Sequence, residues 1–166
     1  MIHSLVELLR QQGVPAELVT ALISAVPIAE LRGGIPAGLL LGLSMKQAFL
    51  WACLGNLLPV IPLLLFLDPV SRWLRRWPVW DRFFAWLFAR TARKSELIRK
   101  YEAVGLAIFV AIPLPMTGAW TGCAAAFLFQ LPFRLAFPAV AAGVLGAGVL
   151  VALAIRIGLG LFYAAL

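Results

Sequence analysis

Two long uncharged segments constrain the fold of this chain more than any other feature. Residues 47–67 and residues 135–155 each contain 21 residues without a charge, and charged residues flank both. At about 1.5 Å per helical residue, each segment is about as long as the 30 Å hydrocarbon core of a bilayer is thick. The whole chain is 63% hydrophobic and 13% charged. These values predict an all-α integral membrane protein with two spanning helices.

The sequence around these segments repeats with an offset of 88 residues. Residues 45–49 (Met-Lys-Gln-Ala-Phe) match residues 133–137 (Phe-Arg-Leu-Ala-Phe), and Gly55 matches Gly143. We interpret the match as an internal duplication that covers a single membrane domain.

Each spanning segment follows a longer apolar segment that Pro and Gly interrupt. Residues 18–45 would measure about 42 Å as one straight helix, which overshoots a bilayer, and residues 103–133 are longer still. Broken segments at matching positions of two halves are typical of transporter repeats. We expect two re-entrant hairpins in an inverted repeat; four full spans, with parallel halves and both termini cytoplasmic, is the alternative. The prolines expected at the hairpin turns are Pro27, Pro36, Pro113 and Pro115.

Most of the net charge of +7 comes from the linker between the two halves, residues 69–102. The positive-inside rule places this basic block of a multi-pass membrane protein in the cytoplasm. Trp and Phe recur in the linker at helical spacing, as in an amphipathic helix that lies in the headgroup layer. Anionic headgroups, rather than nucleic acid, are the expected partners of its arginines. These arginines are Arg72, Arg75, Arg76 and Arg82.

The ends of the chain and its nucleophiles suggest neither processing nor catalysis. Residues 1–17 lack the features of a signal peptide and are expected to form an N-terminal helix, while residues 156–166 form an apolar tail. His3 is the only histidine, and Cys53 and Cys123 lie inside apolar segments, where a thiol is normally packed. We therefore expect no enzyme activity, no metal site and no cofactor.

Glu30 and Arg32 are the charges that need an explanation, because residues 18–45 are otherwise uncharged. On a regular helix the two side chains would point about 200° apart, but in a broken segment they can pair. Charges at membrane depth generally mark a functional site. Glu30 could carry a coupling proton, and Arg32 with half-helix N-termini would suit an anion. The candidate substrate-binding residues of the two breaks are Glu30, Arg32, Gly33, Gly34, Thr117, Gly118, Trp120 and Thr121.

Residues 30–36 and residues 112–122 together resemble the bacterial and archaeal family of small multidrug export proteins. The resemblance covers nearly the whole chain and implies drug export. It departs from the family at Met116, where a glycine is expected. The plan of two opposed hairpins is also similar to that of the DedA family, which implies flipping of polyprenyl-phosphate or phospholipid.

Three functions remain open at this point. The first is a transporter of an anionic amphipathic substrate, such as a lipid phosphate, which binds between the hairpin tips. The second is proton-coupled export of small hydrophobic cations, with Glu30 as the shared site and Trp120 as a stacking surface. The third is a membrane scaffold without transport. A homodimer would thicken the thin wall that two spans and two hairpins make around a cavity.

Overall fold

The computed structural model describes residues 14–74, 76, 96–112 and 118–165, and these are mainly helical. The helices are α2 (Ala16–Ala25), α3 (Glu30–Leu40), α4 (Met45–Leu57), α5 (Val60–Leu74), α7 (Glu96–Ala111), α8 (Ala119–Leu128) and α9 (Phe133–Ala165). No described residue belongs to a strand, so the all-α prediction is confirmed.

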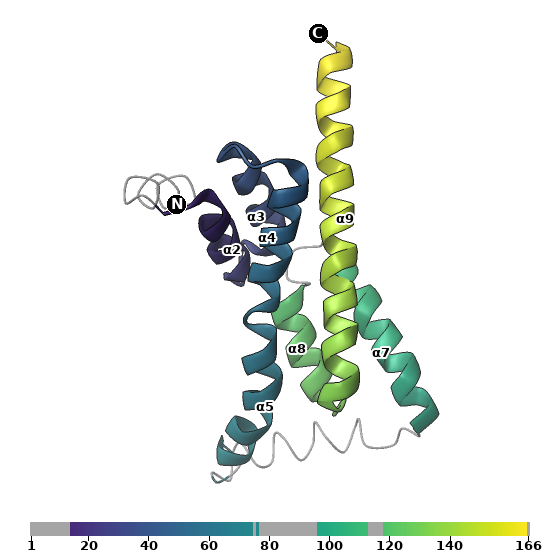
Figure 1. Cartoon of the computed structure of the whole chain (residues 1–166). Helices are drawn as coiled ribbons and strands as arrows, with labels where there is room; N and C mark the ends of the chain where they lie inside the picture. The colour runs from purple at the N-terminus through teal and green to yellow at the C-terminus, as the bar shows by residue number, and fades with distance from the viewer. Residues whose placement is uncertain (1–13, 75, 77–95, 113–117, 166) are drawn as a thin grey trace.

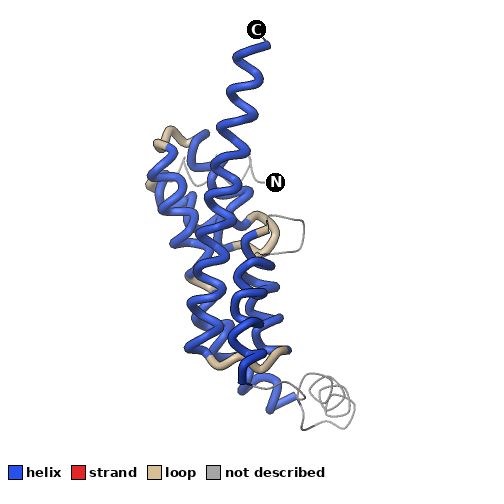
Figure 2. Tube along the Cα trace, turned by 90° about the vertical axis from the view of Figure 1, so that its right-hand side faces the viewer, coloured by secondary structure: helices blue, strands red, loops and turns tan. Residues whose placement is uncertain are grey.

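The shorter helices form two pairs that pack against two long columns, with α2 and α7 on the outer sides of the columns (Figure 1). One column is α4 followed by α5, and the other is α9, which runs in the opposite direction. The first helix pair, α2 and α3, lies beside one end of the columns, and the second helix pair, α7 and α8, lies beside the other end (Figures 1 and 2). The ends of α2 and α8 nearest the middle of the molecule therefore face each other.

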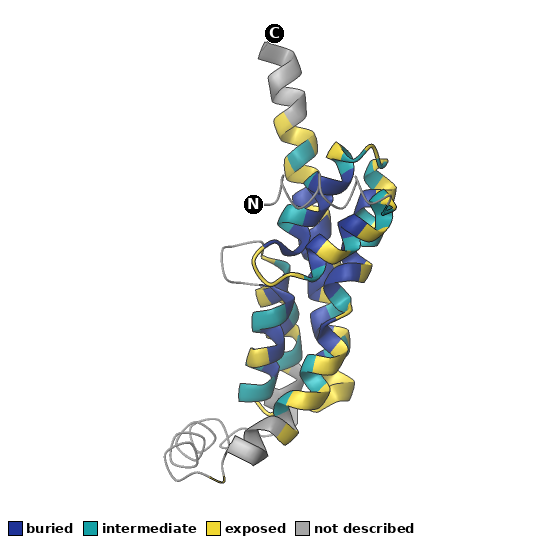
Figure 3. Cartoon of the chain, turned by 90° about the vertical axis from the view of Figure 1, so that its left-hand side faces the viewer, coloured by how far each residue is buried: buried dark blue, intermediate teal, exposed yellow. Residues whose placement is uncertain are grey.

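Two stretches are long and apolar enough to cross a membrane, judged by length and composition. They are Met45–Leu67 and Phe133–Gly158, which include the two predicted spans. Only 28% of the apolar window in the first and 39% in the second is buried inside the protein. Exposed residues accordingly cover much of the outer surface of both columns (Figure 3). A surface of this kind needs a further apolar environment to cover it.

The first broken segment contains a turn, as predicted, but the turn is shorter than expected. It covers residues 26–29 and includes Pro27, and α3 begins at once with Glu30. Gly33, Gly34 and Pro36 lie inside α3, so the prediction that Pro36 flanks the turn is wrong. Proline costs the helix one backbone hydrogen bond, and burial of the adjacent Ile35 offsets this loss. A Cβ on Gly34 would overlap the Ser24 hydroxyl, so this glycine lets α3 lie close against α2.

Two local features of the backbone recur at the offset of 88 residues that the sequence shows. Helices α3 and α8 both end in a Schellman motif, with Gly42 and Gln130 in the left-handed region at φ 91° and φ 53°. Gly55 and Gly143 also have equivalent roles, since a Cβ on Gly55 would overlap the Ala21 backbone in α2, and one on Gly143 would crowd α7. Each long column thus packs closely against the outer helix of its own pair.

The two columns differ in continuity. The predicted span 47–67 is interrupted at residues 58–59, between α4 and α5, because Pro59 and Pro62 lack the N–H groups that a continuous helix needs. In contrast, α9 is unbroken and continues past Arg156, so the predicted apolar tail is helical as far as Ala165. Its C-terminal end projects beyond the other helices in Figure 1.

Several predicted features lie outside the described residues. Residues 75 and 77–95, which include Arg75, Arg82 and most of the amphipathic face, are among them, and so are residues 1–13 of the expected N-terminal helix. Arg72 belongs to α5, and Arg76 is exposed.

A shared core holds the two halves together. It is built from small and β-branched residues of α3, α4, α7, α8 and α9, and α9 contacts both helix pairs. Its most buried members include Ile35, Ala48, Val110, Cys123 and Val140. Small side chains allow the helix axes to approach closely. The core thereby holds the facing ends of α2 and α8 in place near the middle of the molecule.

Candidate functional site

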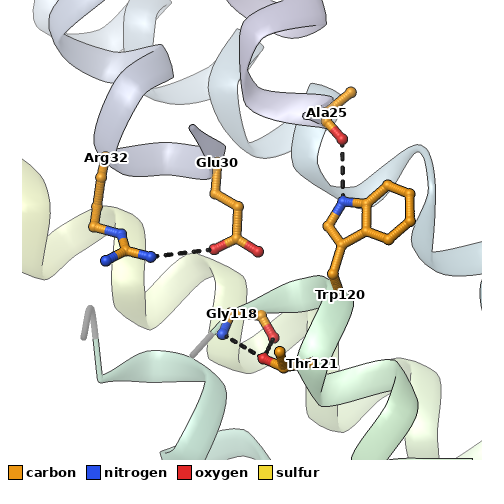
Figure 4. Close-up of polar contacts among 6 residues, drawn as sticks. All are labelled: Ala25, Glu30, Arg32, Gly118, Trp120 and Thr121. Atoms are coloured by element: carbon orange, nitrogen blue, oxygen red, sulfur yellow. Dashed lines mark hydrogen bonds and ion pairs between the residues drawn. The ribbon is translucent and has the colours of Figure 1, made fainter. Parts of the chain in front are cut away.

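The candidate site lies where the two helix pairs meet (Figure 4). We call residues 26–32 the first tip and residues 118–121 the second tip. Glu30 is the central residue of the first tip: its residue exposure is 6%, and its backbone adopts a left-handed conformation with φ 44°. A residue other than glycine in this region is held at a cost of about 1–2 kcal/mol. Such strain is found mainly where the surrounding structure imposes it, as at functional sites.

The Glu30 side chain reaches across to the second tip. Its carboxylate lies so close to Gly118 that a Cβ there would overlap it, and the backbone N–H groups of Ala119 and Trp120 interact with it. These groups belong to the first turn of α8, where unpaired N–H groups and the helix dipole favour a negative charge. Glu30 therefore supplies a charged cap to a helix of the other half of the molecule.

Arg32 is the second charge of the first tip. Its Nη2 atom lies 3.9 Å from Oε2 of Glu30, so the predicted interaction between the two side chains is present as an ion pair. The separation exceeds that of a hydrogen bond, and the attraction is therefore Coulombic. The Arg32 side chain is 31% exposed and the Glu30 side chain 8%. The arginine thus has access to the surroundings that the carboxylate lacks.

Trp120 makes the reciprocal contact, from the second tip to the first. Its indole Nε1–H donates a hydrogen bond of 3.1 Å to the backbone oxygen of Ala25 (Figure 4). Ala25 is the last residue of α2, and carbonyl groups at a helix C-terminus need such a partner. The two tips are consequently joined in both directions, by a carboxylate at one helix N-terminus and an indole at another helix C-terminus.

The other predicted site residues take more local roles. The Thr121 hydroxyl accepts a hydrogen bond of 3.0 Å from the Gly118 N–H and donates one of 3.2 Å to the Gly118 carbonyl. It is thus engaged at the start of its own helix. Gly33 and Gly34 lie within α3, while Thr117, Pro113 and Pro115 lie outside the described residues.

A small cavity adjoins Glu30. The space that the centre of a water molecule can occupy in it is about 10 Å³. This is about the smallest volume that can hold one water molecule. Glu30, Arg32 and Asn56 supply its polar side chains. The apolar part of the wall comes mainly from Val110, Val144, Ala147 and Val151. This volume is too small for a drug-sized molecule.

Asn56 was missed in the reading of the sequence. It lies in α4 and is 1% exposed, and its Oδ1 atom has no hydrogen-bond partner among the residues that the structure describes. The signal was available, since Asn56 is an amide in the middle of an uncharged apolar segment, where polar groups are costly. Among the described residues, no three His, Cys, Asp or Glu side chains gather in a way that could hold a metal ion.

Comparison with known proteins adds one finding to this geometry. The sequence model of a family described as "Putative small multi-drug export protein" matches residues 30–150. The chain belongs to this family. The matched region begins at Glu30 and includes the second tip, all of the cavity-lining residues except Val151, the whole first apolar stretch and most of the second. Most of the site described above therefore lies within the region that the family model matches. No curated protein and no solved structure matches the chain.

Proposed function

We propose that this protein is a small membrane exporter of hydrophobic cations, and that Glu30 couples their export to proton entry. Three observations support a membrane transporter: membership in the export family, the two apolar spans and the small buried share of those spans. Helices α2 and α3 have 10 and 11 residues, about half a bilayer each. We therefore propose that the two helix pairs enter the membrane from opposite sides as re-entrant hairpins.

The observation that carries the mechanism is the position of the Glu30 carboxylate, buried against the N-terminus of α8. While charged, the carboxylate attracts Arg32 and the N–H groups of the second tip, and so holds the tips together. A proton on Glu30 removes this attraction, and a cationic substrate competes for the same oxygens. Because one carboxylate cannot serve both at once, binding of the substrate and binding of the proton exclude each other. Exchange of one for the other across the membrane gives coupled export.

The direct test is Glu30→Gln, which keeps the shape of the side chain but removes its charge. In proteoliposomes with an imposed pH gradient, we expect the variant to lose gradient-driven transport of a fluorescent lipophilic cation. Glu17→Gln is the matched control, since Glu17 lies in the first turn of α2 and does not line the cavity. Transport by Glu30→Gln that still responds to the gradient would rule out this mechanism.

Arg32 and the N-terminus of α8 favour a second candidate, the movement of an anionic amphipath such as polyprenyl-phosphate or phospholipid. An anionic head would have to displace the Glu30 carboxylate from these two positive groups. The two candidates predict opposite results for Glu30→Gln: loss of cation export in the first, and faster flipping of the anion in the second. Arg32→Ala should abolish anion movement, and Arg32→Lys should retain part of it, because lysine keeps the charge but loses the planar fork.

The proposal also includes the orientation of the protein in the membrane and its assembly as a homodimer. We place residues 69–102 on the cytoplasmic side of a prokaryotic inner membrane, where the arginines of the linker would contact anionic headgroups. A homodimer would add a wall to the cavity between the tips. Labelling of a cysteine placed at Ser4 from outside intact cells tests the orientation, since protection of that cysteine is expected only with four full spans.

A further inference from the structure

Asn56 has a buried amide oxygen to which no described residue donates a hydrogen bond. Its side chain lines the cavity beside Glu30, is 1% exposed as a residue, and leaves Oδ1 without a hydrogen-bond partner. Leaving a buried carbonyl unpaired costs a protein more than replacing it with an apolar group. An unpaired buried acceptor in a native structure therefore needs an explanation, and a hydrogen-bond donor bound in the cavity, whether a water molecule or a ligand, is the simplest one.

The matching position of the second half shows that the fold can do without this amide. Val144 lies 88 residues after Asn56 and lines the same cavity. Gly55 and Gly143, one residue earlier in each half, both allow close packing against the outer helix. The backbone environments correspond, and the chemistry differs only at the side chain. We infer that packing of the column does not require an amide here, since valine stands at the equivalent place.

The remaining wall of the cavity limits the class of ligand. Glu30 offers carboxylate oxygens that Arg32 approaches only to 3.9 Å, and Asn56 offers a carbonyl oxygen. Two acceptors, one of them charged, favour a positively charged donor. The volume of about 10 Å³ admits one group the size of a water molecule, such as the N–H head of an amine. Arg32, with its side chain 31% exposed, has room to turn outward when a second cation arrives.

We propose that Asn56 is a substrate-recognition residue that selects protonated amines over quaternary ammonium ions. Its Oδ1 accepts a hydrogen bond from the N–H of the amine, while Glu30 supplies the opposite charge. The apolar body of the substrate lies against Val110, Val144 and Val151 once the tips separate. A quaternary ammonium ion has no N–H and so cannot donate a hydrogen bond to Oδ1. This inference rests on the proposed export of cations and specifies its substrate class.

A matched pair of probes tests the proposal with the full-length protein in lipid nanodiscs. The probes are benzyldimethylamine, which is protonated at neutral pH and carries one N–H, and benzyltrimethylammonium, which carries none. Calorimetry measures the affinity of each, with empty nanodiscs as the baseline. We expect the wild type to bind the N–H probe about tenfold more tightly, since about 1.4 kcal/mol from a buried hydrogen bond corresponds to a factor of ten.

Asn56→Val, which copies the second half, should reduce this preference to about one while leaving the melting temperature unchanged or higher. Asn56→Leu is a second apolar variant that provides the same measurement if the valine variant does not fold. If Asn56 had only a structural role, its substitution would lower the melting temperature and leave the preference intact.

Equal affinities of the two probes for the wild type, as expected if the cavity holds only water, would overturn the role of Asn56. If Glu30→Gln still weakened both probes, the proposed export of cations would survive, whereas absence of binding of either probe to the wild type would overturn both proposals.

Discussion

The first tip and the second tip are equivalent positions of a repeated backbone, yet they carry different chemistry. With the offset of 88 residues, Glu30 corresponds to Gly118 and Arg32 to Trp120. The first tip contributes charged side chains, whereas the second contributes backbone N–H groups and an indole. If both tips carried the same charged side chains, like charges would face each other where the tips meet. The difference shows how one scaffold, used twice, can supply both halves of a complementary contact.

The same asymmetry extends from the tips into the columns. Asn56 in α4 faces the cavity from one column, and Val144 faces it from the other. All the polar side chains of the cavity wall therefore come from the first half, and the second half supplies most of the apolar surface. Such a division suits a ligand with a polar head and an apolar body. Three substitutions at matched positions test how far the comparison holds.

Gly118→Ala should have the largest effect, because it makes the second tip more like an ordinary helix start. The added methyl would overlap the Glu30 carboxylate and push it away from the N-terminus of α8. Loss of partners by a buried charged group costs about 2–3 kcal/mol, which thermal unfolding in detergent can measure. Gly105→Ala in α7 is the control, since a Cβ there meets nothing within 4 Å and alanine favours the helix.

A double-mutant cycle isolates the contact between the tips. In a Glu30→Ala background the methyl of Gly118→Ala has no carboxylate to displace, so the second substitution should cost little. If the two effects instead add fully, the carboxylate does not depend on the second tip, and the two halves are not coupled through it.

Trp120→Phe should have a smaller effect, because it keeps an aromatic ring and removes only the N–H donor. The carbonyl of Ala25 then loses its partner, at a cost of about 1–2 kcal/mol. The control is Trp51→Phe, the same chemical change in α4, which should alter the melting temperature little. Equal effects of the two substitutions would mean that the indole contributes only its size. A selective loss for Trp120 would show that each tip holds the other through a contact of its own.

The sequence alone predicted the helical class and the interaction of Glu30 with Arg32, but not the other contacts between the tips. Charge spacing located both spans, and the Pro and Gly pattern located the first turn near Pro27. The helical position of Pro36 could not be predicted, because burial of neighbouring residues decided it. Nor could the bond from Trp120 to Ala25, which joins residues 95 positions apart. Contacts of this kind depend on how the halves pack, which local propensity does not contain.

Gln130→Gly should have the smallest effect and should raise stability. Gln130 and Gly42 occupy the same place in the two Schellman motifs, both exposed, with φ 53° and φ 91°. A left-handed conformation costs a side-chain-bearing residue about 1–2 kcal/mol, part of which glycine loses again through its greater freedom in the unfolded chain. We expect a net gain of about 1 kcal/mol, or a rise of about 2–4 °C in melting temperature. The reverse change, Gly42→Gln, should lower stability by a similar amount, because a Cβ there meets nothing within 4 Å and only the backbone is affected. Equal and opposite shifts in the melting temperatures of the two variants would show that positions 42 and 130 have the same backbone energetics. The differences between the two tips would then come from their side chains and not from their backbones.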